Sequence, residues 1–306
     1  MSMKQALIPI LVGMLSLIAC GGYIVLPDEI DNSAAAASLG WSAVATNVDE
    51  SETGDLHIDL TIRNETASWS AMQAVADNPA QLTTGDGQTS DCDTVFVGTG
   101  GHRLAPGFQM RGFIAGTKAE PHAQLIYVEC EGAAAVPGSK LTIEYSYVIG
   151  EYNYYEPDAT QVDTTLEVDL DQVATDLTYP LAEPIDGLIQ SPDTEITAIN
   201  DVVLTLAAAE RTDQGLQFNW QTSNPGEYPS YVHIGTPPVI GADGILYGLY
   251  ETPDIVSVPI TPAGDKADWM TEVAVPQDIT DLYIMLSVES KKQRLFVYYA
   301  VDVTDK

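Results

Sequence analysis

Apolar and polar residues alternate along several short segments of this chain, and this period of two constrains the fold more than any other feature. Residues Leu56–Ile62 read LHIDLTI, and residues Leu216–Trp220 read LQFNW. Successive side chains of a β-strand point to opposite faces, so each segment predicts a strand with one buried and one wet face. Turn signals separate such strands about every ten residues, which is typical of β-sandwiches. We therefore predict an all-β protein.

The alternating pattern occurs twice, in the same order, which predicts two sandwiches in tandem. Each half opens with an apolar strand, a polar turn, an alternating strand and then an asparagine, Asn64 or Asn224. A chain of 306 residues is also long enough for two domains of roughly 100–200 residues each. Residues 176–196 contain three prolines and several acids, which favours a stiff linker. We predict sandwiches over residues 39–175 and 197–306. Duplication is one explanation of the repeat.

The first residues predict an export signal. Ala6–Ala19 is apolar and uncharged behind Lys4, and it is too short for an ordinary spanning helix of ~20 residues. It ends in Leu17-Ile18-Ala19-Cys20, which resembles the lipobox of bacterial lipoproteins. The resemblance implies removal of residues 1–19, a lipid on Cys20 and a place on the outer side of a membrane. An ordinary signal peptide with an incidental cysteine is the alternative.

The residues after Cys20 favour a tether. Residues 20–38 mix Gly, Ala, Ser and acids without a period, which is typical of a flexible connection. In Gram-negative lipoproteins an Asp after the lipidated cysteine tends to keep the protein at the inner membrane. Gly21 stands here instead, so the resemblance allows an outer destination.

The charge balance excludes one class of partner. There are 44 acidic and 12 basic residues, which gives a formal net charge of −32. Such a chain repels phosphate backbones, so we expect no nucleic-acid binding. It also repels anionic lipid surfaces. A solvated coat that keeps the protein soluble is the plainest explanation. Cation binding and a high-salt habitat are the alternatives.

The cysteine count predicts a disulfide. With Cys20 assigned to the lipid, Cys92 and Cys130 remain as a pair, and pairs outside the cytoplasm usually form disulfides. A metal or redox site is the alternative, but the chain contains no CxxC, and no histidine adjoins either cysteine.

One segment carries a resemblance to a fold family. Residues Asp55–Asn64, DLHIDLTIRN, form a strand ending in Arg-Asn soon after the lipobox and tether. This arrangement resembles the immunoglobulin-like domains of many bacterial surface lipoproteins. The resemblance implies an immunoglobulin-like fold and an adhesive or ligand-binding role.

No motif in the chain predicts catalysis. The four histidines have no HxH or HExxH spacing, and phosphate-loop, GxGxxG and GxSxG motifs are absent from the sequence. We therefore expect no enzyme and no cofactor.

His57 falls on the polar face of its strand. His102 and Arg103 follow a Gly pair in a predicted loop and are weak binding candidates. Three carboxylates could offer oxygens to calcium, although a wet strand face explains them better: Glu167, Asp169 and Asp171.

Tyrosines mark two candidate binding surfaces. Tyr152, Tyr154 and Tyr155 lie at a predicted turn beside acids, which suits carbohydrate or protein contacts; an aromatic corner that covers the sandwich end fits equally well. Tyr228 and Tyr231 lie in a segment dense in Gly, Pro and Tyr, which indicates a binding loop. The alternative there is a blunted sheet edge.

These observations together predict an exported, lipid-anchored protein of the cell envelope that acts as a non-catalytic binding or structural module. Its partner would be another envelope protein or a glycan. An accessory subunit of an envelope transport or secretion complex is the second hypothesis. A hydrolase of unrecognised type is the third.

Overall fold

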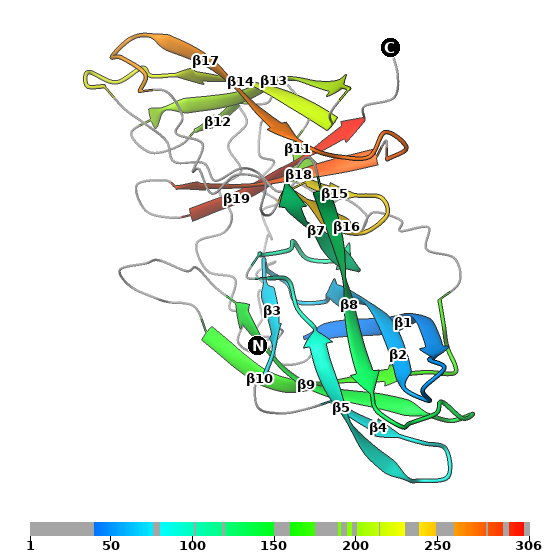
Figure 1. Cartoon of the computed structure of the whole chain (residues 1–306). Helices are drawn as coiled ribbons and strands as arrows, with labels where there is room; N and C mark the ends of the chain where they lie inside the picture. The colour runs from blue at the N-terminus through cyan, green and yellow to red at the C-terminus, as the bar shows by residue number, and fades with distance from the viewer. Residues whose placement is uncertain are drawn as a thin grey trace, which may run out of the picture.

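The structure is a computed structural model of the chain, and it is built from strands. It describes residues 40–75, 80–100, 102–117, 120–149, 160–174, 189–190, 195–197, 201–213, 215–229, 239–248, 260–279, 281–289 and 294–302. No α-helix occurs among these residues, so none of them forms a helix that could cross a membrane. The strands form two sandwiches, one in the lower and one in the upper part of Figure 1.

Ten strands lie in the described residues from Trp41 to Asp169. They are β1 (Trp41–Glu50), β2 (Leu56–Asn64), β3 (Ala71–Ala74), β4 (Ala80–Thr83), β5 (Thr89–Phe96), β6 (Gln109–Met110), β7 (Gly112–Thr117), β8 (Glu120–Cys130), β9 (Lys140–Ile149) and β10 (Thr160–Asp169).

Nine strands lie in the described residues from Ile189 to Asp302. They are β11 (Ile189–Gln190), β12 (Glu195–Thr197), β13 (Val203–Thr212), β14 (Gly215–Ser223), β15 (Val239–Gly241), β16 (Ile245–Tyr247), β17 (Lys266–Val273), β18 (Asp281–Glu289) and β19 (Arg294–Asp302).

Sandwich 1 packs one sheet, in which β1, β2 and β8 are neighbours, against a second sheet of β10, β9 and β4. Strand β5 belongs to both sheets, because residues 89–92 pair with β4 and residues 93–96 pair with β8. In sandwich 2 one sheet has the order β12-β13-β14-β17, and β16, β15, β18, β19 and β11 follow one another in the other.

Each sandwich has its own hydrophobic core. Leu56, Ile58, Leu60 and Ile62 on β2 are at most 2% exposed and belong to the first core. On β14, the side chains of Leu216, Phe218 and Trp220 are at most 1% exposed and belong to the second core. Burying one such side chain contributes roughly 1.5–3 kcal/mol. The alternation in the sequence therefore identified the core faces of both strands.

Three hairpins of sandwich 1 have counterparts in sandwich 2. Hairpin β1–β2 corresponds to β13–β14, hairpin β4–β5 to β15–β16, and hairpin β9–β10 to β18–β19. The first hairpin of each sandwich carries a register shift at the same place. In sandwich 1 the shift lies just past the pair Ala45–Leu60, and in sandwich 2 it lies just past the pair Leu206–Trp220. A shift shared at one position supports duplication of a common unit.

Asn64 and Asn224 close equivalent corners. Nδ2 of Asn64 donates to the carbonyl oxygens of Ser68 (2.9 Å) and of Leu104 (2.8 Å). Nδ2 of Asn224 donates to those of Tyr228 (2.8 Å) and Thr261 (2.9 Å). Each amide therefore joins the loop that follows it to a second loop.

The backbone bonds of the two corners also match. Gly107 and Gly264, with φ of 77° and 75°, each donate an N–H to the carbonyl of the corner asparagine. Glycine tolerates this left-handed conformation without steric cost. Both asparagines are at most 1% exposed. We call these two arrangements corner 1 and corner 2.

Truncating either corner amide should destabilise its sandwich. Asn64→Ala and Asn224→Ala each remove two hydrogen bonds from the amide to loop carbonyls and one from a backbone N–H to Oδ1. We therefore expect each to lower the free energy of unfolding by about 2–3 kcal/mol. Urea unfolding followed by tryptophan fluorescence measures this. Asn219→Ala, on the outward side of β14, is the matched control and should change stability by less than about 0.5 kcal/mol. Equal effects at positions 219 and 224 would contradict a structural role for the corner.

One feature breaks the repeat. In sandwich 2 the strand beside β14 is continuous, because β17 pairs with it from Lys266 to Val273. In sandwich 1 the corresponding strand is split: β6 pairs with the end of β2, and residues 126–130 of β8 pair with its beginning. The N–H of Ile126 donates to the carbonyl of Arg111 at 2.9 Å, which closes the gap. Residues 112–125 are thus an insertion, which we call the insertion hairpin.

The insertion hairpin joins the two sandwiches. Its strands β7 and β8 pair with each other, and β7 also pairs in parallel with β16 of sandwich 2. Figure 1 shows β8 running downward from the sheet that contains β16 into the lower sandwich. Leu125 packs against the second core, while Ile240 and Leu246 of sandwich 2 belong to the first. The sandwiches therefore share a sheet and exchange core residues.

The prediction of an all-β chain built of sandwiches is confirmed. Tyr145 and Tyr147 are buried on one face of β9 with Ile143. The predicted linker, residues 176–196, contributes β11, which pairs in parallel with β19, and the start of β12.

Candidate functional site

Among the residues of sandwich 2 that the structure describes, the most exposed large apolar side chains lie at corner 2. Tyr228 is 78% exposed and Ile260 is 68% exposed. Asn224 holds both loops, since its Nδ2 binds the carbonyls of Tyr228 and Thr261. We define the corner 2 tip as residues 225–229 and 260–265. The sequence pointed to Tyr228 through its loop composition, but no pattern distinguished Ile260.

His102 and Arg103 lie in the loop of corner 1. The backbone N–H of His102 donates to the carbonyl of Thr99 at 3.0 Å, and Thr99 in turn binds the backbone of Met72. Desolvation by burial lowers the pKa of His102 from 6.5 to about 4. Its imidazole is therefore neutral near pH 7. The structure places this pair in a packed loop at the end of sandwich 1.

The buried imidazole predicts a pH dependence of stability. The folded-state pKa of about 4 lies below the unfolded value of 6.5, so the unfolded chain binds the extra proton first. Folding stability is then lost as the pH falls from 6.5 towards 4, by up to about 3 kcal/mol. Urea unfolding across this pH range should show a shallower loss for His102→Gln than for the natural chain. Parallel stability curves for the two proteins would contradict this assignment.

The three carboxylates suggested as calcium ligands each accept hydrogen bonds from a different protein group. Glu167 accepts a hydrogen bond from Lys140 Nζ at 2.6 Å. Asp171 accepts the N–H of Gly138, and Asp169 accepts the N–H of Asp171. Within the residues that the structure describes, no three His, Cys, Asp or Glu side chains gather closely enough to hold a metal ion. These acids serve as turn caps and as a surface ion pair.

His57 lies on the outward side of β2, as its place in the alternation predicted. Its Nε2 lies 3.0 Å from Asp59 Oδ1, its Nδ1 lies 3.5 Å from Glu129 Oε1, and its ring centroid lies 4.9 Å from that of Tyr127. The side chain is 36% exposed. The imidazole, the two carboxylates and the ring of Tyr127 form a polar cluster at the surface. No nucleophile among the described contacts completes a catalytic arrangement.

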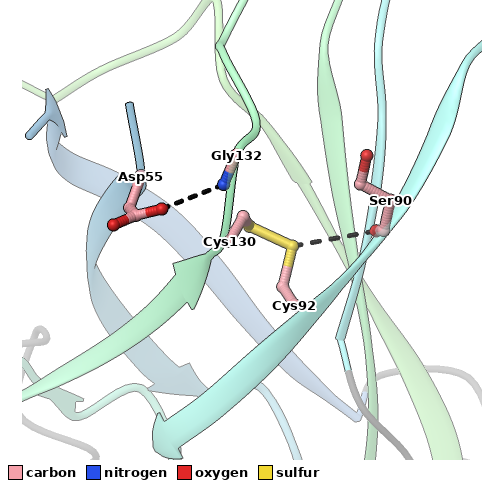
Figure 2. The surroundings of a disulfide bond; sticks show 5 residues. All are labelled: Asp55, Ser90, Cys92, Cys130 and Gly132. Carbon is pink, nitrogen blue, oxygen red and sulfur yellow. Dashed lines mark hydrogen bonds between the residues drawn. A yellow bond between two sulfur atoms is a disulfide. The ribbon is translucent and has the colours of Figure 1, made fainter. Parts of the chain in front are cut away.

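The predicted disulfide between Cys92 and Cys130 is present. Its cysteines are 2% and 0% exposed. It joins β5 to the end of β8 at the point where β5 passes from one sheet to the other. Figure 2 shows it beside the turn that Asp55 closes by accepting the N–H of Gly132. The bond therefore fixes the crossing strand inside sandwich 1.

Several predicted site residues lie outside the described residues. They are Cys20, Tyr152, Tyr154, Tyr155 and Tyr231. The lipid site and the tyrosine turn consequently stay predictions.

No family model matches the chain, and no curated protein matches it. Among solved structures, it is similar to a Salmonella enterica SafA pilin in complex with the SafB chaperone, with 10% identity, 86% of this chain and 97% of that chain covered, and a TM-score of 0.18. It is also similar to the YadV chaperone (11%, 86% and 100%, TM-score 0.20) and to the E. coli chaperone DraB (10%, 87% and 98%, TM-score 0.17). TM-scores of this size say nothing of what this chain binds.

Proposed function

We propose that this chain is an exported lipoprotein whose two joined sandwiches form a non-catalytic binding or structural module of the cell envelope. The buried Cys92–Cys130 disulfide is the observation that supports export most directly, since such bonds persist in oxidising compartments. Cys20 then remains as the single cysteine outside the pair, at the end of an apolar leader. A lipid there would anchor the module.

The described surface supports a binding role. It offers turn caps, surface ion networks and one apolar tip. The coat of excess carboxylates, net −32 for the chain, keeps such a module soluble. Rigid sandwiches that present loops at their ends are a common scaffold for recognition.

Metabolic labelling tests the anchor. Cells that express the full chain are fed an alkyne fatty acid, and the purified protein is examined for the label. We expect label on the natural chain and none on Cys20→Ser. Cys92→Ala is the matched cysteine control and should keep the label. Equal labelling of the natural chain and Cys20→Ser would refute the lipid anchor.

A second measurement tests whether the two sandwiches lie outside the cytoplasmic membrane. A membrane-impermeant maleimide probe, applied to intact cells after an outer-membrane permeabilisation step, should reach a cysteine placed at exposed Val95. A label that appears only after the cytoplasmic membrane is broken would refute export.

A further inference from the structure

Each cysteine of the disulfide stands between two acids in the sequence. Residues 91–93 on β5 read DCD, and residues 129–131 at the end of β8 read ECE. All four of these acids are exposed, whereas the cysteines are buried. The chain has 44 acids among 306 residues, so composition alone does not account for acids at all four flanking positions. No lysine or arginine lies within five residues of either cysteine in the sequence.

The fold brings the two acidic pairs together. Asp93 lies directly opposite Glu129 in the antiparallel pairing of β5 with β8. Carboxylates at directly opposite positions repel each other. A register shift between Asp93 and Phe96 also interrupts the pairing of these two strands. The disulfide therefore bonds two strands whose own charges oppose their contact.

Asp55 adds a fifth carboxylate beside the bond, as Figure 2 shows. Its Oδ2 accepts the hydroxyl of Thr53 at 2.6 Å, and its Oδ1 accepts the N–H of Gly132 at 3.0 Å. These two hydrogen bonds, the first more than the second, lower the pKa of Asp55, so it is ionised at neutral pH. His57 is the basic group that contacts this region, with Nδ1 3.5 Å from Glu129 Oε1. One imidazole among five carboxylates leaves the surroundings of the bond negative.

Disulfides break and form by thiol–disulfide exchange. In reduction, a reagent thiolate attacks one cysteine sulfur, the S–S bond breaks, and its electron pair leaves on the other cysteine sulfur. A second reagent thiolate then releases the first cysteine, so two reagent thiols become one reagent disulfide. In formation, the two cysteine thiols pass two electrons to a disulfide oxidant, which leaves as two thiols. Each step brings the charge of the reagent next to the flanking acids.

We propose that these flanking carboxylates make the Cys92–Cys130 pair charge-selective in thiol–disulfide exchange. Cationic disulfides and thiols react with it fast, and anionic ones such as glutathione react slowly, because like charges repel at the short separations of exchange. The acids are sequence neighbours of the sulfurs, so the selectivity acts in the unfolded chain as well as in the folded protein. A protein that oxidises this pair therefore has to present a basic surface around its own reactive cysteines. The selectivity does not depend on the lipid anchor.

Oxidation of the unfolded chain tests the selectivity. The full chain with Cys20→Ser is reduced, unfolded in urea at about pH 8, and mixed with cystamine, which is cationic, or with oxidised glutathione, which is anionic. Alkylation of the free thiols followed by mass spectrometry gives the two rates. We expect the ratio of the cystamine rate to the glutathione rate to be at least about tenfold larger for this chain than for a variant without the flanking acids. That variant carries Asp91→Asn, Asp93→Asn, Glu129→Gln and Glu131→Gln.

The ratio separates charge selectivity from general reactivity, because both reagents meet the same thiols. A matched control removes two Asp and two Glu charges from exposed positions of sandwich 2 and should keep the natural ratio. It carries Glu195→Gln, Glu210→Gln, Asp213→Asn and Asp268→Asn. Raising the salt from about 0.1 M to about 1 M shortens the screening length from about 10 Å to about 3 Å. The natural ratio should then approach that of the variant without the flanking acids.

The folded, oxidised chain provides the second assay. Its reductants are cysteamine and 2-mercaptoethanesulfonate, at concentrations where each rate is proportional to the reductant. The ratio of the cysteamine rate to the sulfonate rate should again be several times larger with the flanking acids than without them. An unchanged ratio in either assay, or an equal loss of the ratio in the sandwich 2 control, would overturn the proposal. Circular dichroism verifies that the exposed substitutions leave the fold intact.

Discussion

Replacing Cys92 and Cys130 together by alanine should lower the free energy of unfolding by about 4 kcal/mol. The bond closes a loop with a sequence separation of 38, and the chain-entropy model assigns a stabilisation of that size to such a loop. The effect should be large for this protein because β5 changes sheets at Cys92. Without the bond, no covalent link holds β5 and β8 together at that point, and backbone pairing and core packing remain.

Urea unfolding of the natural chain and of the double variant, each with and without dithiothreitol, measures this effect. Reductant should move the natural midpoint towards that of the double variant and should leave the variant itself unchanged. A double variant as stable as the oxidised natural chain would show that the bond adds nothing to the fold.

Deleting the insertion hairpin, residues 112–125, should uncouple the two sandwiches. Arg111 and Ile126 already lie within one hydrogen bond of each other, and joining them restores the continuous strand that β17 forms in sandwich 2. Sandwich 1 should therefore keep its fold. Sandwich 2 should lose several kcal/mol, because β16 loses its partner β7 and the core loses Leu125.

Differential scanning calorimetry measures the uncoupling. We expect one transition for the natural chain and two for the deletion variant, with sandwich 2 melting at the lower temperature. Leu125→Ala keeps the hairpin backbone and removes only side-chain packing, so it should shift the melting temperature without splitting the transition. A single cooperative transition in the deletion variant would show that the remaining junction contacts suffice.

The sequence predicted local features well because their signals are local. The alternation of Leu56–Ile62 and Leu216–Trp220 identified which side chains are buried, since a strand has a fixed period of two. The shared asparagine pattern pointed to the tandem repeat, and the cysteine pair pointed to the disulfide. Each of these inferences needed only residue types and their spacing.

The relation between the sandwiches could not be predicted from the same signals. Residues Gln124–Val128 read as one strand of the first sandwich, but β8 serves both, with pairing to β7 up to Leu125 and to β2 from Ile126 onward. Partner choice in a sheet depends on contacts distant in sequence. The burial of His102 has the same origin, because a loop packed by its fold looks like any other loop in sequence.

The candidate site was predicted only in part. Tyr228 was singled out from the Gly, Pro and Tyr content of its segment, and the structure exposes it. Ile260 gave no signal, because one apolar residue beside a proline-rich turn reads as part of a core strand. Only the tertiary hydrogen bonds of Asn224 bring the two loops together.

The insertion hairpin also limits how this protein can be taken apart or recombined. The two halves share a pattern of hairpins, yet Gly112 and Phe113 of the first half pair with β16 in a sheet of the second. Scission in residues 176–196 would consequently yield two fragments that stay associated. If the halves were separated, sandwich 1 would carry an unpaired hairpin, and sandwich 2 would lack the strand that pairs with β16. The two halves therefore have to be kept together.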